Sequence, residues 1–160
     1  MRFNNEMKVL FICTGNTCRS YMAQVILEKL AKEKKIDLTV SSAGIQAIDG
    51  IPAYPYAKMA LKKNGYEDKK HYSKSISELT LNENDLILTM EVKQRDYLKF
   101  TFPQLSHKII TVSELAVDTE GDIDDPIALE YTEYEKIFKK IEEYTIKIFK
   151  RLIKKYNLET

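Results

Sequence analysis

A run from Lys8 to Ile12, apolar after its first residue, stands near the start of the chain. A run of this length without polar alternation is typical of a strand buried on both faces, and such strands occur mainly in parallel sheets that carry helices on each side. Gly15 then interrupts the pattern, and apolar residues recur at helical spacing over residues 22–30. The chain therefore begins with a predicted strand, a loop and a helix.

The rest of the chain continues this alternation. Further strands are predicted at 38–41, ending at Gly44, at 85–90 and at 108–112, and helices at 55–63, at 92–99 and over most of the last 30 residues. This order predicts an α/β fold with an open four-stranded parallel sheet and helices on both faces. Ligands in such folds bind beyond the carboxyl ends of the strands, which points to the loop after the first strand.

Length and charge narrow the class of protein. The chain has 160 residues, which favours a single domain over residues 1–160. The net charge is +1, from 25 basic and 24 acidic side chains, and this balance gives no electrostatic reason to expect binding to nucleic acid or to a membrane. Residues 1–6 are too polar and too short to form a secretory signal. We therefore expect a cytoplasmic protein.

The loop from Cys13 to Ser20 has the residue types of an anion site. Successive backbone N–H groups in a tight loop, together with the first turn of the following helix, converge on one point. Gly15 is expected to supply a backbone angle that larger residues resist. Arg19 completes the ring, because a guanidinium grips two phosphate oxygens at once. The predicted phosphate-binding residues are Thr14, Gly15, Asn16, Thr17, Cys18 and Ser20.

Cys13 lies at the base of this predicted site. The field that binds phosphate also stabilises a thiolate, and Ser20 is placed to donate a hydrogen bond to the sulfur. The thiolate would attack phosphorus in line with the leaving group. An isolated cysteine here would be interpreted as a small apolar residue that ends the strand. The spacing Cys-x5-Arg-Ser between strand and helix favours a nucleophile instead.

The segment Cys13 to Ser20 closely resembles the phosphate-binding loop of the low-molecular-weight protein tyrosine phosphatases. The resemblance extends to the strand end at Ser42 to Gly44, to the strand at 85–90 and to the pair Asp125-Pro126. It covers about residues 7 to 155 and leaves residues 1–6 as an extension. We therefore expect this family's fold, a single phosphatase domain with its phosphate-binding loop after the first strand.

The resemblance implies a role for each matching residue. Cys13 would be the nucleophile that forms a cysteinyl-phosphate, and Arg19 would bind the phosphate and the transition state. Asn16 would hold the shape of the loop, and Ser20 would orient the thiolate. Asp125 would protonate the leaving group and then activate the water that hydrolyses the intermediate, help that is typically worth ~10²–10⁴-fold in rate.

Other polar residues receive lesser roles. Asp124 rivals Asp125 only because it is adjacent, and Asp118 and Asp122 are interpreted as ordinary loop carboxylates. The two histidines, at positions 71 and 107, offer no ligand cluster and are predicted at the surface. No metal or cofactor is expected. The implied partners are phosphorylated proteins, with inorganic phosphate as product, and we expect a monomer or a weak dimer.

The chain departs from the tyrosine-specific pattern at several positions. Thr14 and Thr17 stand where many members carry Leu and Ile, and this pair resembles the bacterial protein-arginine phosphatase branch. A threonine at position 17 would leave room and polarity for a phosphorylated guanidinium. Ile127 stands where members generally carry an aromatic ring, and Tyr131 lies four positions further on. Phosphotyrosine and phosphoarginine therefore remain nearly equal, with a slight preference for phosphoarginine from Thr17.

Two more residues of the loop region carry alternatives. Tyr21 replaces the proline that usually follows the Arg-Ser pair, and its ring either lines the mouth of the pocket or packs on the helix. Cys18 is predicted to form a reversible disulfide with Cys13 that protects the nucleophile from over-oxidation. This bond requires Cα atoms within ~7 Å. The alternative for Cys18 is a small buried side chain at the start of the helix.

Two other functions fit part of the pattern. An arsenate reductase of the same fold has a similar loop, but it needs a cysteine pair far downstream, and no cysteine follows Cys18. A non-catalytic phosphate-binding module would retain Arg19 and the loop. It would have no use for Cys13 and Asp125 together. The sequence therefore favours a phosphoprotein phosphatase over both alternatives.

Overall fold

The four predicted strands pair side by side in the computed structural model, which describes residues 6–67 and 69–156. They are β1 (Met7–Cys13), β2 (Leu38–Gly44), β3 (Leu86–Thr89) and β4 (Ile109–Thr111), all parallel and in the order β2-β1-β3-β4. Val9 of β1 lies beside Val40 of β2 and Leu86 of β3. The predicted four-stranded parallel sheet is confirmed.

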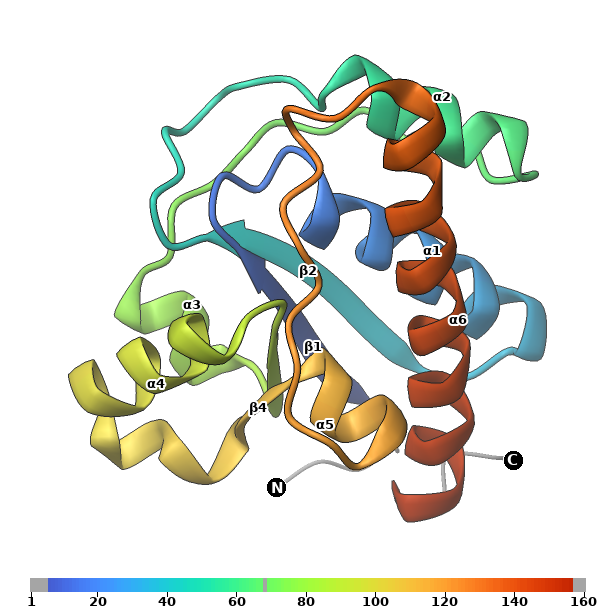
Figure 1. Cartoon of the computed structure of the whole chain (residues 1–160). Helices are drawn as coiled ribbons and strands as arrows, with labels where there is room; N and C mark the ends of the chain where they lie inside the picture. The colour runs from blue at the N-terminus through green and yellow to red at the C-terminus, as the bar shows by residue number, and fades with distance from the viewer. Residues whose placement is uncertain (1–5, 68, 157–160) are drawn as a thin grey trace.

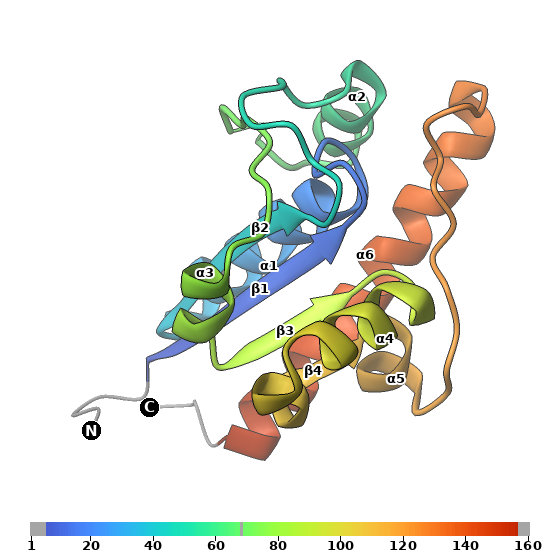
Figure 2. The same ribbon diagram turned by 90° about the vertical axis from the view of Figure 1, so that its left-hand side faces the viewer.

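Helices cover both faces of this sheet, as predicted (Figures 1 and 2). One face carries α1 (Arg19–Lys34), α5 (Val112–Val117) and α6 (Tyr131–Tyr156). The opposite face carries α3 (Glu78–Glu83), α4 (Val92–Thr101) and the 3-10 helix η1 (Pro103–Lys108). α2 (Pro55–Lys63) packs against α1 and α6 near the carboxyl ends of the strands.

The side chains of β1 explain why helices are needed on both faces. Val9 and Phe11 belong to the core between the sheet and α1, α5 and α6. Leu10 and Ile12 belong to a second core under α3, α4 and η1. All four are fully buried, because successive strand residues point to opposite faces and both faces are covered. The unbroken apolar run is thus accounted for.

Three short helical elements escaped the sequence prediction, whereas the longer ones were found. α2 matches the predicted range, with Pro55 in its first turn and Gly65 beyond its end at φ 88°. The elements that were missed, α3, α5 and η1, have six residues each, too few for a helical period to show. In the described part of the chain, no helix combines the length and the apolar character that crossing a membrane requires.

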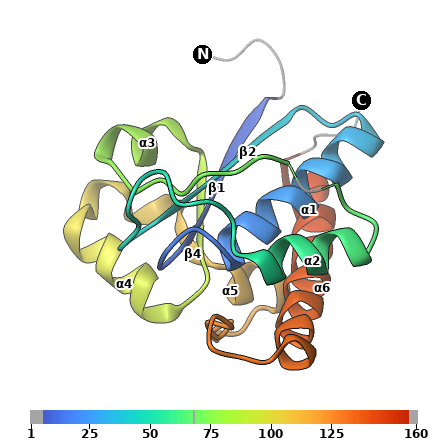
Figure 3. The same cartoon turned by 90° about the horizontal axis from the view of Figure 1, so that it is seen from above.

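The carboxyl ends of β1 and β3 lie at the point where the strand order changes direction. The chain moves from β1 to β2 on one side and then returns to β3 on the other side of β1. Crevices at such switch points bind ligands in open α/β sheets. The loops after β1 and β2 gather above this edge, and the segment 118–130 runs past it between α5 and α6 (Figures 2 and 3).

Candidate active site

The sharp turn between β1 and α1 is made by Asn16. Its φ of 58° lies in the left-handed region, which asparagine tolerates better than most residues. Gly15, the residue predicted for this role, does not lie in that region, and a Cβ there would meet only the Thr17 hydroxyl, at 3.9 Å. That prediction is wrong, because the strained position falls one residue later, where side-chain hydrogen bonds offset its cost.

Asn16 is buried and bonded on every side. Its Nδ2 donates to Ser20 Oγ at 2.8 Å, and its Oδ1 accepts from the backbone N–H of Lys74 at 3.0 Å. Its carbonyl oxygen accepts from His71 Nε2 at 2.7 Å, and its own N–H points at the sulfur of Cys13, 3.2 Å away. The loop is therefore fixed both to α1 and to the segment before α3.

The end of β2 presses against the same loop. The N–H groups of Ile45 and Gln46 donate to the carbonyl oxygens of Cys13 and Thr14 at 3.0 and 2.9 Å. At Gly44 a Cβ would lie 2.6 Å from the Thr14 carbonyl oxygen, closer than real Cβ atoms come. This close approach of the two backbones requires glycine at position 44, the last residue of β2.

Cys13 ends β1 with its sulfur inside the turn of the loop. The residue is 2% exposed, and Sγ lies 2.9 Å from Ser20 Oγ and 3.2 Å from the N–H of Asn16. Ser20 Oγ already accepts a hydrogen bond from Asn16 Nδ2, so its own hydrogen is available to the sulfur. Two donors thus face Sγ, an arrangement that suits a sulfur anion.

The guanidinium of Arg19 is held by an acidic residue that the sequence analysis did not identify. Nη1 donates to Glu91 Oε2 at 2.5 Å and to the Ile123 carbonyl at 2.7 Å. Nη2 donates to Thr14 Oγ1 at 3.3 Å. Arg19 is 1% exposed, so its charge is paired inside the protein at the edge of the loop. Glu91 follows β3 directly, and no sequence signal separated it from other surface carboxylates.

Asp125 is a second carboxylate, after Glu91, that lies near the guanidinium of Arg19. Its Oδ2 lies 3.8 Å from Arg19 Nη2, and its Oδ1 accepts from the N–H of Ile127 at 3.1 Å. The side chain is 46% exposed, so it remains accessible to solvent. Asp124 is exposed and makes no hydrogen bond or ion pair with the residues that the structure describes. The geometry therefore favours Asp125 over its neighbour.

The segment that carries Asp125 is tied down at several points. Arg151 donates two hydrogen bonds to the carboxylate of Asp118, at 2.9 and 2.8 Å. Asp122 accepts from the N–H of Val92, at the start of α4, at 2.8 Å. Asp118 and Asp122 are loop carboxylates, as predicted, and in addition both anchor the segment 118–130 to neighbouring helices.

Comparison with known proteins identifies the family of this site. Residues 8–158 match the family model for the low molecular weight phosphotyrosine protein phosphatases. The chain belongs to this family. It is 30% identical to a protein-arginine-phosphatase of Bacillus subtilis over 92% of this chain and 98% of the relative. It is 33% identical to the low molecular weight protein-tyrosine-phosphatase Wzb of Salmonella typhi, over 84% of this chain and 87% of the relative.

Solved structures of family members share the whole architecture. The YwlE arginine phosphatase from Geobacillus stearothermophilus superposes with a TM-score of 0.87 at 31% identity, over 93% of this chain and 94% of that one. A mutant of YwlE with a phosphorylated active-site serine gives a TM-score of 0.90 at 29% identity, over 96% and 100% of the two chains. The recognition of the fold and of a phosphoprotein phosphatase family from the loop is confirmed.

The two threonines of the phosphatase loop have different surroundings. Thr14 Oγ1 accepts from Arg19 Nη2 and from Gln94 Nε2, at 3.3 and 3.1 Å, so it is committed to the guanidinium network. Thr17 is half-buried, and its hydroxyl lies 3.9 Å from the sulfur of Cys18. Of the two, Thr17 has the hydroxyl that remains available at the loop surface.

The aromatic residues of the phosphatase lie mostly beside the site and pack together. Tyr131 meets the ring of Tyr56 edge-on, with centroids 5.3 Å apart, and lies under the ammonium of Lys63. Ile127, in contrast, is 46% exposed. A groove of about 580 Å³ opens next to Thr14 and Asp125, with Tyr97 on its wall. Because the ring of Tyr131 packs against Tyr56, it is not free to line this groove in place of an aromatic residue at position 127.

The second loop cysteine is buried at the start of α1. Burial raises the pKa of the Cys18 thiol to about 11, despite the nearby hydroxyls of Tyr134 and Thr17 that lower it. Both cysteines of the phosphatase are unpaired thiols. A thiol with this pKa is a poor nucleophile near neutral pH. Of the two alternatives for Cys18, the structure therefore shows the small buried side chain at the start of the helix. The reversible disulfide with Cys13 stays a prediction.

His71 is not the plain surface residue that was predicted. It is half-buried, donates from Nε2 to the Asn16 carbonyl and stacks on the ring of Tyr21, with centroids 4.5 Å apart. Tyr21 is fully buried, and its hydroxyl donates to the Lys69 carbonyl at 3.1 Å. The two alternatives for Tyr21 were a place at the mouth of the pocket and packing on the helix, and the fully buried ring that stacks on His71 excludes an exposed place at the mouth. In residues 6–67 and 69–156, no three His, Cys, Asp or Glu side chains are grouped to hold a metal ion.

Proposed function

We propose that this phosphatase hydrolyses phosphoproteins through a cysteinyl-phosphate on Cys13. The observation that carries the proposal is the position of its sulfur, inside the loop and facing two hydrogen-bond donors, with the buried guanidinium of Arg19 at the edge. In the related YwlE arginine phosphatase, a serine placed at the active site is itself phosphorylated. A residue that becomes phosphorylated at the active site has attacked phosphorus, and this supports a nucleophile at the matching position of the loop.

The proposed reaction has two steps. The Cys13 sulfur forms a bond to phosphorus while the bond from phosphorus to the leaving oxygen or nitrogen breaks, and Asp125 gives its proton to that leaving atom. A water molecule then attacks phosphorus and gives a proton to Asp125, and the thiolate leaves. Arg19 and the loop N–H groups bind the phosphoryl oxygens throughout, which stabilises the transition state. The product is inorganic phosphate.

Two phosphorylated residues fit this reaction as substrates, phosphotyrosine and phosphoarginine. Thr17 leaves a polar, half-buried position at the loop surface, and relatives with protein-arginine-phosphatase activity match nearly the whole chain. Tyrosine phosphatases match it at similar identity. We therefore favour phosphoarginine slightly, with Thr17 as the residue that selects it.

One comparison of rates tests both parts. Wild type and Cys13→Ser are assayed on p-nitrophenyl phosphate and on matched phosphotyrosine and phosphoarginine peptides. The serine variant should lose turnover and still bind inorganic phosphate, and an active variant would refute the role of Cys13. Thr17→Ile should shift the ratio of kcat/KM values toward phosphotyrosine. An unchanged ratio would dismiss Thr17 as the selector.

A further inference from the structure

Gln94 lies in the first turn of α4, and its side chain is buried although it is polar. The residue is 5% exposed. Together with Thr14 and Asp125 it lines the groove of about 580 Å³ beside the active site. A buried amide costs free energy unless its oxygen and its nitrogen are hydrogen-bonded, so its partners indicate what the residue does there.

The orientation of the Gln94 amide follows from its hydrogen bonds. Its Oε1 accepts from the backbone N–H of Glu91 at 3.1 Å, as part of the capping box that begins α4. Because a backbone N–H can only donate, the amide oxygen must face it, and Nε2 must point the other way. Nε2 then donates to Thr14 Oγ1 at 3.1 Å and lies 3.4 Å from Glu91 Oε2.

Both side chains that Gln94 Nε2 contacts are partners of the Arg19 guanidinium. Both hydrogens of Nη1 are used, by Glu91 Oε2 at 2.5 Å and by the Ile123 carbonyl oxygen at 2.7 Å. One hydrogen of Nη2 is used by Thr14 Oγ1 at 3.3 Å. In the described part of the chain, these bonds leave the Nε–H and the second hydrogen of Nη2 for two oxygens of a phosphoryl group.

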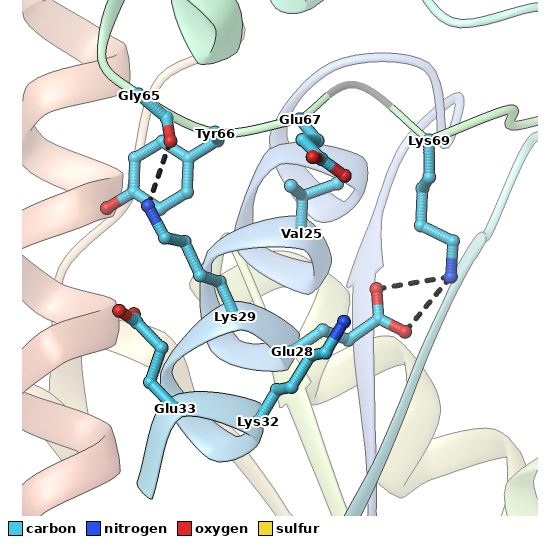
Figure 4. Close-up of a pocket in the computed structure, with 9 residues that line it drawn as sticks. All are labelled: Val25, Glu28, Lys29, Lys32, Glu33, Gly65, Tyr66, Glu67 and Lys69. Atoms are coloured by element: carbon cyan, nitrogen blue, oxygen red, sulfur yellow. Dashed lines mark hydrogen bonds and ion pairs between the residues drawn. The ribbon is translucent and has the colours of Figure 1, made fainter.

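A groove on α1 shows the opposite situation, with polar side chains that do not belong to the active site (Figure 4). Lys29 Nζ donates to the carbonyl oxygen of Gly65 at 2.8 Å, and Lys69 Nζ lies 3.0 Å from Glu28 Oε2. None of the residues that line this groove belongs to the loop from Cys13 to Ser20. Gln94 differs from these residues because it bonds a side chain of that loop directly.

We propose that Gln94 is a positioning residue that acts through Thr14 and Glu91 to hold the guanidinium of Arg19 in the orientation that binds the phosphoryl oxygens. This inference rests on the proposed phosphatase function and adds a residue to it. A guanidinium binds two oxygens at once only when its plane is correctly turned. If Thr14 and Glu91 lose the amide between them, that plane is less firmly held, and binding of the phosphoryl group weakens.

The first test compares Gln94→Met with Asp122→Ala. The methionine variant keeps the length of the side chain and loses its hydrogen bonds, whereas Asp122→Ala loosens the same end of α4 without touching Thr14. In Gln94→Met we expect kcat/KM to fall and the inhibition constant of inorganic phosphate to rise, each about threefold to tenfold. Phosphotyrosine and phosphoarginine peptides should lose equally, because Arg19 binds the oxygens that they share.

Asp122→Ala should leave inhibition by phosphate unchanged, even where urea unfolding shows the same loss of stability in both variants. An unchanged phosphate constant in Gln94→Met, an equal rise in Asp122→Ala, or a loss on one of the two peptides only would overturn the proposal.

Two further variants separate the positioning role from the cap of α4. Gln94→Glu keeps an acceptor for the N–H of Glu91 and loses the donor to Thr14, so it too should bind phosphate more weakly. Lys93→Gln makes the same change of net charge at an exposed neighbouring position and is its control. If Gln94 acts through Thr14, the loss of kcat/KM in Gln94→Met/Thr14→Val should be smaller than the product of the two single losses. Single losses that multiply, or equal phosphate affinity in Gln94→Glu and Lys93→Gln, would refute the link.

Binding of inorganic phosphate is also measured by calorimetry in the Cys13→Ser background, where no turnover is needed. If Gln94→Met weakens that binding while wild type hydrolyses none of the substrates, the positioning role stands and the phosphatase function fails. If wild type hydrolyses them and the Gln94 variants match it in rate and in phosphate affinity, the positioning role alone fails.

Discussion

Asn16 combines a left-handed backbone with hydrogen bonds from its side chain, its carbonyl and its N–H. The backbone strain of a non-glycine residue in this region costs roughly 1–2 kcal/mol. Glycine would remove that strain but would leave Ser20 and the N–H of Lys74 without the amide that bonds them. The asparagine is therefore retained for its contacts, and the two effects can be separated by mutation.

Asn16→Gly and Asn16→Ala form a matched pair for this purpose. Both variants lose the side-chain hydrogen bonds, so both should bind phosphate more weakly and turn over more slowly, by about tenfold. Only the alanine variant also carries the strain, so its free energy of unfolding should be lower by roughly 1 kcal/mol than that of the glycine variant. Urea unfolding and phosphate inhibition measure both. Equal stabilities would show that the turn relaxes when the side chain is lost.

Asp125 and Asp124 are adjacent, but only Asp125 comes within 3.8 Å of Arg19. Asp125→Ala should therefore slow hydrolysis of aryl phosphates by at least ~10²-fold, because the leaving oxygen departs without a proton. Asp124→Ala should leave the rate close to that of wild type. The loss should be smaller for leaving groups of low pKa, which need less protonation. A large effect at Asp124 in place of Asp125 would move the assignment by one residue.

At the scale of elements, the segment 118–130 positions Asp125 through contacts with α4 and α6. Asp122 bonds the first N–H of α4, and the Ile123 carbonyl accepts from Arg19. The Ile123 N–H in turn donates to the carbonyl of Met90. The general acid and the phosphate clamp are thus held by one run of backbone, although Arg19 and Asp125 are far apart in sequence.

Asp122→Ala removes the bond to the N–H of Val92 and should loosen this segment. We expect kcat to fall severalfold while inhibition by inorganic phosphate is unchanged, because Arg19 and the loop remain in place. The free energy of unfolding should fall by about 1 kcal/mol, as for the loss of a helix cap. Asp124→Ala, on the same segment, is the control. A parallel loss of phosphate affinity would indicate that Asp122 acts on Arg19.

The sequence alone predicted the long elements and the reactive loop, and it failed where contacts between distant segments decide. The apolar run in β1 and the period of α6 are local signals, and both were found. The six-residue helices α3 and α5 give no such signal. Glu91 and His71 were missed as site residues because only the fold brings them to Arg19 and Asn16. The sequence predicted the unusual backbone angle at Gly15 because glycine adopts such angles most easily. In the structure the left-handed residue is Asn16, where side-chain hydrogen bonds stabilise it.

At the scale of the whole molecule, four acidic hydrogens on α6 or on residues near it have raised pKa values, at Cys18, Tyr66, Tyr131 and Tyr134. Burial is the main reason that the pKa of the Cys18 thiol is raised to about 11. Burial is also the main reason that the pKa values of three tyrosine hydroxyls are raised, those of Tyr66, Tyr131 and Tyr134. In the unfolded chain these groups lose their protons near pH 8.5–10 (about the values of free thiol and phenol). Above this range the unfolded state binds fewer protons than the folded state.

The free energy of unfolding should therefore decrease as the pH rises from about 9 to 11, by at most ~1.4 kcal/mol per pH unit for each group that titrates only in the unfolded chain. Lys108, whose pKa is lowered by burial, acts in the opposite direction but is a single group. Urea unfolding at a series of pH values measures the slope. Tyr134→Phe should flatten it, whereas Tyr97→Phe, at a half-exposed position, should not. A stability that is constant up to pH 11 would mean that these groups reach solvent in the folded state.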